Sequence, residues 1–260
     1  MRLRLLRAPR ALAVVAAAFV SSAAAMPALA QSFTPAQRAE IETIVRDYML
    51  KRPEILQEVL AELEKRQALA EAAKAKAAVQ THAAELFNSP HQVVVGNPEG
   101  DVTLVEFFDY NCGYCKRALD DLQALIADDS KLRVVLKEFP VLGEGSVEAA
   151  KVAVAVRMQD PKGEKYFDFH KRLLGGRGQA DKARALAAAQ AAGLDMARLE
   201  RDLASKEVRD SLAENMKLAE ALGLTGTPTY VVGTEVVMGA VGREALSQRI
   251  NMARCGQTSC

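Results

Sequence analysis

The stretch VTLVEFFDYNCGYCK, residues 102–116, decides the fold of this 260-residue chain. Its first part, Val102 to Phe108, is rich in β-branched and aromatic residues, which is typical of a buried strand. A loop with two cysteines follows, and a helix is predicted from about Tyr114 to Ala127. Cys112 and Cys115 therefore lie where a strand passes into a helix, with two residues between them.

This position gives the cysteine pair a specific chemistry. Unpaired backbone N–H groups and the dipole at the start of a helix favour an anion, so the thiolate of Cys112 is stabilised there. A thiolate attacks a disulfide or leaves from one, and Cys115 is close enough to resolve the mixed disulfide. The residues alone leave two other roles open, namely a purely structural bridge or half of a zinc site completed by Cys255 and Cys260.

Cys255 and Cys260 form a second pair near the end of the sequence. Four residues separate them, including Gly256, and this spacing permits a small closed loop. A second disulfide is the first expectation, and metal binding or two free thiols are the alternatives. Because the loop is short, such a bridge would add little stability.

The remaining pattern alternates between strands and helices. An all-helical insertion is predicted over about residues 146–223, because Asp160-Pro161 and several glycines divide this region into four or five short helices. A final helix is predicted from Gly242 to Arg254. These elements predict an α/β layer with a helical subdomain set into it. The other predicted strands are Gln92–Val95, Leu132–Phe139, Pro228–Val232 and Glu235–Met238.

The first thirty residues have the features of a secretory signal peptide. Four arginines without an acid precede an apolar run of ten residues, Ala11 to Val20, which is too short to span a bilayer comfortably. Ala28-Leu29-Ala30 then matches the small-x-small pattern of a cleavage site. We therefore expect residues 1–30 to be removed on export to the periplasm, where disulfides persist. An uncleaved N-terminal anchor is the alternative.

Residues 31–88 form a predicted N-terminal helical region, interrupted at Arg52-Pro53. One side of these helices carries an apolar stripe, and the stripe has to be covered, either by the rest of the chain or by the same helices of another subunit. The alanine-rich stretch between Leu69 and Leu86 favours the second, so we expect a homo-oligomer, a dimer or a trimer. The stripe consists of Ile41, Ile44, Val45, Tyr48, Ile55, Val59, Leu60 and Leu63.

Composition excludes several classes of protein. Apolar residues make up 50% and charged residues 26%, which excludes disorder as the overall state. The mean hydropathy of −0.03 excludes a transmembrane bundle. A formal charge of +1 gives no reason to propose nucleic acid as a partner. Four cysteines are too few for a fold that depends on bridges.

The segment from Val105 to Lys116 resembles the active-site segment of the DsbA family of thioredoxin-fold oxidoreductases. The resemblance continues through Lys137-Glu138-Phe139-Pro140 and through Gly226-Thr227-Pro228-Thr229-Tyr230, and covers about residues 92–254. The N-terminal helices are similar to those of the suppressor-of-copper-sensitivity C (ScsC) group. The resemblance implies a thioredoxin fold over residues 89–260, with the inserted helical subdomain and an N-terminal helical extension.

The resemblance also implies roles for individual residues. Cys112 would be the exposed nucleophile and Cys115 the buried resolving thiol. Thr227-Pro228 would be a cis peptide against the cysteine pair, with the backbone of Thr227 binding an extended substrate. Glu106 matches a buried acid used in proton transfer near the resolving cysteine, and Lys137 matches a lysine that pairs with this acid. From the residues alone, Glu106 and Lys137 are equally consistent with outward-facing charges.

The sequence departs from the family between the cysteines, where Gly113 and Tyr114 replace the Pro-His of strongly oxidising members. We therefore expect a less oxidising pair; Gly-Tyr also occurs in disulfide isomerases of the DsbC type. His82, His91 and His170 lie outside the motif and are interpreted as surface or helix residues.

The leading hypothesis is a periplasmic thiol:disulfide interchange protein, an isomerase or oxidase. It would need no cofactor and no metal, and it would act on exported proteins and be reset by a membrane redox partner. The alternatives are a protein that handles copper through thiolates and a chaperone-like protein.

Overall fold

The computed structural model describes residues 33–160 and 162–260. The expected signal peptide, residues 1–30, lies outside them. The chain divides into two units, and the boundary falls between Val59 and Leu60. Among the described residues, no helix combines the length and the apolar character that crossing a bilayer requires.

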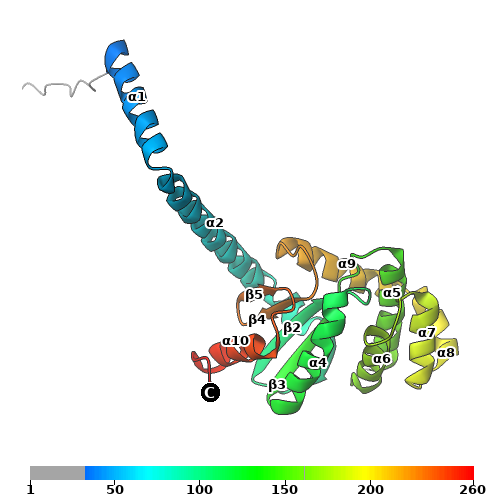
Figure 1. The fold of residues 1–260 in the computed structure, drawn as a ribbon. Helices are drawn as coiled ribbons and strands as arrows, with labels where there is room; N and C mark the ends of the chain where they lie inside the picture. Colours follow the sequence, from blue (N-terminus) through cyan, green and yellow to red (C-terminus); the bar gives the residue numbers. More distant parts are fainter. Residues whose placement is uncertain (1–32, 161) are drawn as a thin grey trace, which may run out of the picture. The chain divides into compact units, whose positions relative to one another are not determined.

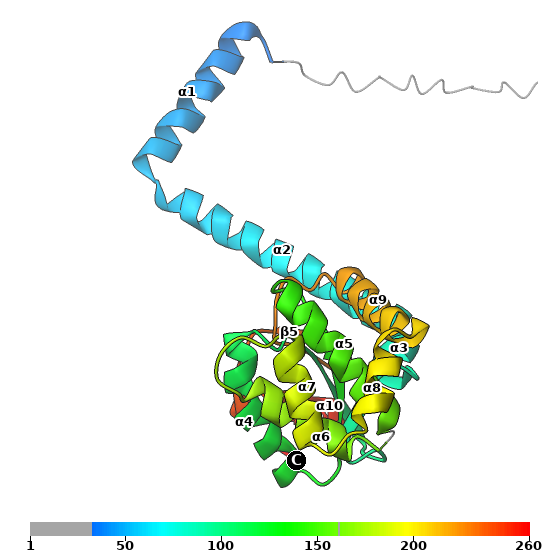
Figure 2. The ribbon, with the colours of Figure 1, turned by 90° about the vertical axis from the view of Figure 1, so that its right-hand side faces the viewer.

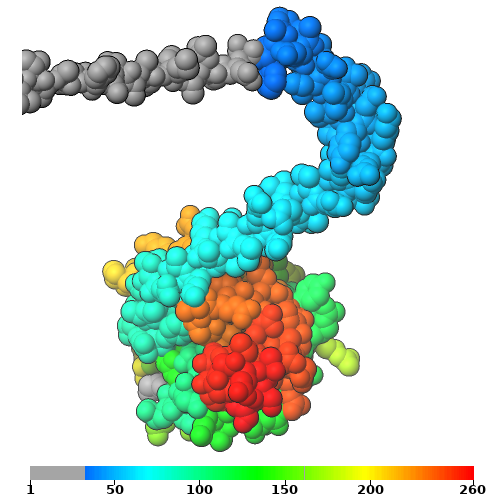
Figure 3. Space-filling model, turned by 90° about the vertical axis from the view of Figure 1, so that its left-hand side faces the viewer, coloured from blue at the N-terminus to red at the C-terminus, as the bar shows by residue number. Residues whose placement is uncertain are grey.

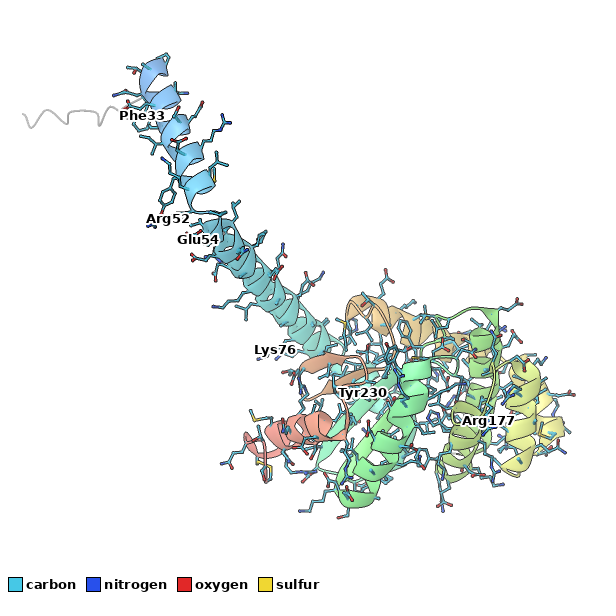
Figure 4. The ribbon with its side chains drawn as sticks, viewed as in Figure 1. Phe33, Arg52, Glu54, Lys76, Arg177 and Tyr230 are labelled. Atoms are coloured by element: carbon cyan, nitrogen blue, oxygen red, sulfur yellow. A yellow bond between two sulfur atoms is a disulfide. The ribbon has the colours of Figure 1, made fainter. Side chains whose placement is uncertain are left out.

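The described part of the first unit is helical. Helix α1, Pro35–Lys51, begins with a capping box in which the Thr34 side chain accepts from the backbone of Gln37 and the Gln37 side chain accepts from the backbone of Thr34. Pro53 ends this helix, because the residue before a proline avoids the helical conformation; Arg52 and Glu54 flank the break in Figure 4. None of the residues of α1 is buried, so its apolar stripe is exposed.

The second unit is built on a five-stranded sheet of order β1-β3-β2-β4-β5. The central strands β2 and β3 run parallel, while β1, β4 and β5 pair antiparallel to their neighbours. The parallel pair requires a crossover, which helix α4, Gly113–Asp128, supplies. The strands are β1 (Val93–Gly96), β2 (Val102–Phe108), β3 (Leu132–Glu138), β4 (Thr229–Val232) and β5 (Glu235–Met238).

Helices cover both faces of this sheet (Figure 1). Helix α4 and helix α10, Arg243–Cys255, pack on the face that carries the even-numbered side chains of β2. Helix α9, Lys206–Ala221, packs on the opposite face with the short helix α3, Ala83–Asn88. The predicted α/β layering is therefore present.

The helical insertion lies between β3 and β4, close to the predicted residues 146–223. Besides α9 it contains α5 (Glu144–Gln159), α6 (Glu164–Leu174), α7 (Lys182–Ala191) and α8 (Met196–Leu203). Figure 2 shows α6, α7 and α8 around α5. Helix α5 is buried along most of its length because its core positions are alanine and valine, whose small side chains let the neighbouring helices approach closely.

The expected boundary between a helical region ending at residue 88 and a domain starting at residue 89 is wrong. Helix α2, Glu54–Thr81, and helix α3 contribute Val79 and Leu86 to the core beside Phe107. Both side chains are almost fully buried, at 1% and 0% exposure. Figure 3 shows this segment in cyan lying against the orange surface of α9, β4 and β5. The second half of α2 therefore belongs to the unit that holds the cysteines.

Candidate functional site

The cysteine pair lies at the N-terminal end of α4. Cys112 is the N-cap residue of this helix, and its sulfur accepts a hydrogen bond from the backbone N–H of Cys115 at 3.3 Å. Both thiols are free. The sulfur of Cys112 thus takes the place that a Ser or Asp side chain takes in an ordinary cap, where backbone donors favour a negative charge.

The expectation that Cys112 is exposed is wrong, because only 5% of it is accessible. Its thiol donates to the carbonyl oxygen of Thr227 at 3.1 Å, so the loop before β4 covers the sulfur. Cys115 is more deeply placed, with 0% exposure. Burial raises the pKa of the Cys115 thiol, and a hydrogen bond from the backbone of Asp109 opposes this shift. Cys112 is therefore the more accessible of the two sulfurs.

The loop that covers Cys112 contains a cis peptide bond between Thr227 and Pro228. Two hydrogen bonds fix this loop: the Thr229 hydroxyl donates to the Gly226 carbonyl at 2.7 Å, and the Gly239 N–H donates to the Pro228 carbonyl at 2.8 Å. The Thr227 carbonyl consequently faces the reactive sulfur. A substrate strand that binds this carbonyl would displace the thiol from it.

Glu106 lies on β2 and faces the same side of the sheet as Cys115. It is 2% exposed, and one of its carboxylate oxygens has no hydrogen-bond partner. Burial raises its pKa to about 8, against a hydrogen bond from Tyr230, its cross-strand neighbour on β4, which lowers it. Figure 4 shows Tyr230 in the sheet next to α4. The charge on Glu106 in turn contributes to raising the pKa of Cys115, so the two groups are coupled electrostatically.

The expected pairing of Lys137 with Glu106 is wrong. Parallel pairing sets Lys137 opposite Phe107 and Glu106 opposite Leu136, so the two charged side chains point to opposite faces of the sheet. The ammonium group of Lys137 instead donates to the Glu85 carbonyl at 2.7 Å. Its pKa is lowered to about 8 by burial, which the Glu214 carboxylate 3.9 Å away opposes. Lys137 thus joins α3 to β3 by a hydrogen bond, on the face of the sheet opposite to Glu106.

Sequence reasoning missed Asp109 and Asn111, which surround the cysteines with hydrogen bonds. The carboxylate of Asp109 accepts four hydrogen bonds. The side-chain amide of Asn111 forms three, with the Ser146 hydroxyl and with the carbonyl and N–H of Ala180. Asp and Asn between a strand and a helix do indicate local turns. Their distant partners, Ser146 and Ala180, left no such pattern in the sequence.

A second polar cluster, also missed, lies under the insertion. The Tyr166 hydroxyl donates to the Glu138 carboxylate at 2.5 Å, and the Tyr110 hydroxyl lies 3.4 Å from the His170 ring. His170 is a helix residue, as expected, but it is 1% exposed and not a surface group. Burial lowers its pKa to about 3, so it is neutral, and burial raises the pKa of Glu138 to about 8. This cluster joins the insertion to the end of β3.

Cys255 and Cys260 are joined in a disulfide at the end of α10. Within the described ranges, there is no group of three or more His, Cys, Asp or Glu side chains that could hold a metal ion. A zinc site made from both cysteine pairs would need the C-terminal bridge to be reduced first. The arrangement instead leaves one free dithiol beside the cis-proline loop, which suits disulfide exchange.

Alkylation should distinguish the two free thiols. We expect iodoacetamide to modify Cys112 at least about tenfold faster than Cys115, because only Cys112 has accessible surface and burial disfavours the thiolate of Cys115. Mass spectrometry of peptides from briefly treated protein measures the ratio. The disulfide-bonded Cys255 and Cys260 serve as the internal control for incomplete oxidation. Faster modification of Cys115 would contradict the assignment.

Two family profiles match this chain. The DSBA-like thioredoxin domain matches residues 103–251, and the Copper resistance protein ScsC N-terminal domain matches residues 37–70. The first match covers the sheet from β2 onward, the insertion and most of α10. The second covers α1 and the first part of α2.

Solved structures resemble the chain over most of their own length. A thioredoxin-like oxidoreductase from Silicibacter pomeroyi is 46% identical, with a TM-score of 0.62; the match covers 66% of this chain and 96% of that one. Proteus mirabilis ScsC in a transitional conformation is 28% identical, with a TM-score of 0.63, over 86% of this chain and 98% of that one. The expected thioredoxin fold is thereby confirmed.

Curated relatives include the Na(+)/H(+) antiporter NhaA 1 of Salinispora arenicola. It is 30% identical over 163 residues, which are 63% of this chain and 25% of the antiporter. The chain thus spans about a quarter of the length of the curated relatives that it matches.

Proposed function

Because the chain belongs to the DSBA-like thioredoxin family and carries an ScsC N-terminal domain, we propose that it is a thiol:disulfide interchange protein acting on exported proteins. One observation carries the proposal. The sulfur of Cys112 lies at the start of α4, within hydrogen-bond distance both of the Cys115 N–H and of the Thr227 carbonyl. The helix end stabilises the thiolate, and the carbonyl holds a substrate strand beside it.

The exchange proceeds in two balanced steps. The thiolate of Cys112 attacks one sulfur of a client disulfide, which forms a mixed disulfide and releases the second client sulfur as a thiolate. Cys115 then gives up its proton and attacks Cys112, so the client leaves reduced and the protein is oxidised. In the reverse direction a client dithiol becomes a disulfide. Glu106, whose pKa burial raises to about 8, accepts the proton of Cys115 in the molecules in which its carboxyl is ionised and returns it in the reverse step.

The apolar stripe of the N-terminal helices supports an oligomer. All its members except the half-buried Ile55 are exposed in the single chain, with Ile44 at 60%, Tyr48 at 50% and Leu60 at 57%. Each large aliphatic side chain gains about 1.5–3 kcal/mol on full burial, so association with the same helices of other subunits is favourable. Several Cys112 sites would then act on one client, which suits isomerisation because a misplaced bond must be broken and remade without release of the client.

The N-terminal sequence supports export to the periplasm. Residues 1–30 combine a basic start, a short apolar run and an Ala-Leu-Ala cleavage pattern. In that compartment the client proteins carry thiols and disulfides, and a membrane redox partner restores the working state of Cys112 and Cys115.

Removal of the stripe should separate simple exchange from isomerisation. A chain that starts at Gln67 keeps Val79 and Leu86 in the core but loses the residues from Ile41 to Leu63. We expect it to be monomeric by light scattering and to reduce insulin within about twofold of the full chain. Its reactivation of scrambled ribonuclease should fall about tenfold, because the sites no longer act at a shared high local concentration.

A full-length variant provides the matched control for this truncation. Ile44→Glu with Tyr48→Glu breaks the stripe at two exposed positions and removes no residues. It should reproduce the loss of isomerisation. A full-length protein that is monomeric before any change, or an unchanged rate of reactivation in both variants, would refute the role of the stripe.

A further inference from the structure

The carboxylate of Asp109 is a buried hydrogen-bond hub just before the cysteines. It is 1% exposed, and each oxygen accepts two hydrogen bonds. One oxygen accepts from the backbone N–H of Asn111 at 2.7 Å and from the Ser146 hydroxyl at 2.7 Å. The other accepts from the backbone N–H groups of Val141 and Leu142 at 2.8 and 2.9 Å. A buried charge held by four donors fixes the geometry of all of them.

The backbone of Asp109 contacts both cysteines. Its carbonyl accepts from the N–H of Cys112 at 3.0 Å, and its backbone hydrogen-bonds to the sulfur of Cys115. One residue therefore connects the reactive pair to the loop that leads from β3 into α5. Asp109 is therefore a shared hydrogen-bond partner of Cys112 and of the backbone of Val141 and Leu142.

Asn111 extends the same network into the insertion. Its side-chain amide donates to the Ser146 hydroxyl and to the Ala180 carbonyl, both at 2.9 Å, and accepts from the Ala180 N–H at 2.7 Å. The backbone at Gly145 comes so close that an added Cβ would lie 2.7 Å from the Ala180 carbonyl oxygen. The loop from β3 into α5 is thus hydrogen-bonded to Asp109 and Asn111 and packs against Ala180.

This rigid loop presents two apolar side chains to solvent. Val141 is 42% exposed and Leu142 is 48% exposed, and Tyr114, inside the cysteine motif, is 60% exposed. Isolated exposed apolar residues are ordinary. A buried carboxylate that fixes the backbone beneath two of them lowers the conformational entropy that they lose on binding, which is what a preorganised contact surface requires.

We propose that Asp109 is a positioning residue: its carboxylate holds Val141 and Leu142 where they contact apolar side chains of a client polypeptide while Cys112 attacks the client's disulfide. The inference rests on the proposed function and deepens it. It separates two classes of substrate, since a small disulfide without a polypeptide chain has nothing to place on Val141 and Leu142.

Asp109→Asn tests the proposal. The amide keeps the shape of the side chain, but its NH₂ group cannot accept from one pair of donors. We expect the KM for insulin, whose two chains are joined by disulfides, to rise about tenfold, the change that corresponds to one charge-assisted hydrogen bond. The KM for oxidised glutathione should stay within about twofold. Any loss of kcat should be shared by both substrates, because the backbone of Asp109 also hydrogen-bonds to both cysteines.

The matched control is Asp195→Asn. Asp195 is the N-cap of α8 and accepts from the Arg198 N–H at 3.0 Å, so the same chemical change is made away from the cysteines. It should alter neither substrate's kinetics. A folded Asp109→Asn protein with an unchanged KM for the insulin client would overturn the proposal, as would an equal rise in the KM for oxidised glutathione.

A surface variant decides the question if Asp109→Asn does not fold. Val141→Ser with Leu142→Ser changes exposed side chains and keeps both backbone donors to Asp109. The same rise in KM for the insulin client is expected, with glutathione unaffected, and Met252→Ser on the exposed surface of α10 is the control. An unchanged KM overturns the proposal. Wild-type protein inactive with both substrates would instead refute the proposed function.

Discussion

Cys112→Ser is expected to lower the rate of insulin reduction about a thousandfold or more, because a hydroxyl at this position is not ionised at neutral pH and does not attack a disulfide. Cys115→Ser should act differently. Cys112 still attacks in this variant, but the mixed disulfide is not resolved within the protein, so covalent complexes with the client accumulate. Turbidity of reduced insulin gives the rates, and non-reducing electrophoresis gives the complexes.

A double variant that lacks the C-terminal bridge is the control for these substitutions. Cys255→Ser with Cys260→Ser removes the exposed disulfide at the end of α10 and leaves the free pair intact. It should reduce insulin at the rate of the unaltered protein. Trapped complexes in Cys112→Ser, and none in Cys115→Ser, would reverse the roles assigned to the two sulfurs.

Glu106→Gln is expected to raise the free energy of unfolding of the reduced protein by about 3 kcal/mol at pH 7. The folded-state pKa of Glu106, about 8, lies above the ordinary value of 4.5. The folded protein therefore holds a proton that the unfolded chain releases. Its contribution to stability is fully present below pH 4.5 and is lost as the pH rises through 8. Glutamine does not titrate, so its contribution to the free energy of unfolding does not depend on pH.

Urea unfolding at pH 5, 7 and 8.5, under reducing conditions, measures this effect. Stability should fall over the range for the unaltered protein and fall less steeply for Glu106→Gln, with the buried Glu138 responsible for part of the remaining slope. Glu220→Gln, on the exposed surface of α9, is the control and should keep the original slope. An unchanged slope in Glu106→Gln would show that the carboxyl is charged in the folded protein.

Much of the fold follows from local sequence pattern. Strand β2 and strand β5 have the predicted bounds, because apolar runs between turn residues determine both ends. The predicted domain boundary at residue 88 is wrong for a physical reason. Helix α2 is rich in alanine and charge along its second half, and only single apolar residues, Val79 in α2 and Leu86 in α3, mark where this segment enters the core. An isolated apolar residue carries no periodicity.

The residues of the site could be predicted where they lie close together in the sequence. Cys112 and Cys115 stand out because a strand, a pair of thiols and a helix follow directly in the sequence. Lys137 was misassigned because the face of a strand residue depends on register, and no property of residue 137 itself reveals the partner of residue 106. Asp109 was missed for a related reason, since its partners at Val141 and Ser146 come into contact only in the folded chain.

The hydrogen bonds from Asn111 to Ala180 bear on protein engineering. A redox tetrapeptide is an attractive unit to graft onto other proteins, because four residues are easily exchanged. In this chain, however, Asn111, directly before the CGYC motif, is held by residues 35 and 69 positions further along. The motif is therefore not portable on its own. A graft that reproduces its behaviour has to include the start of α5 and the segment before α7.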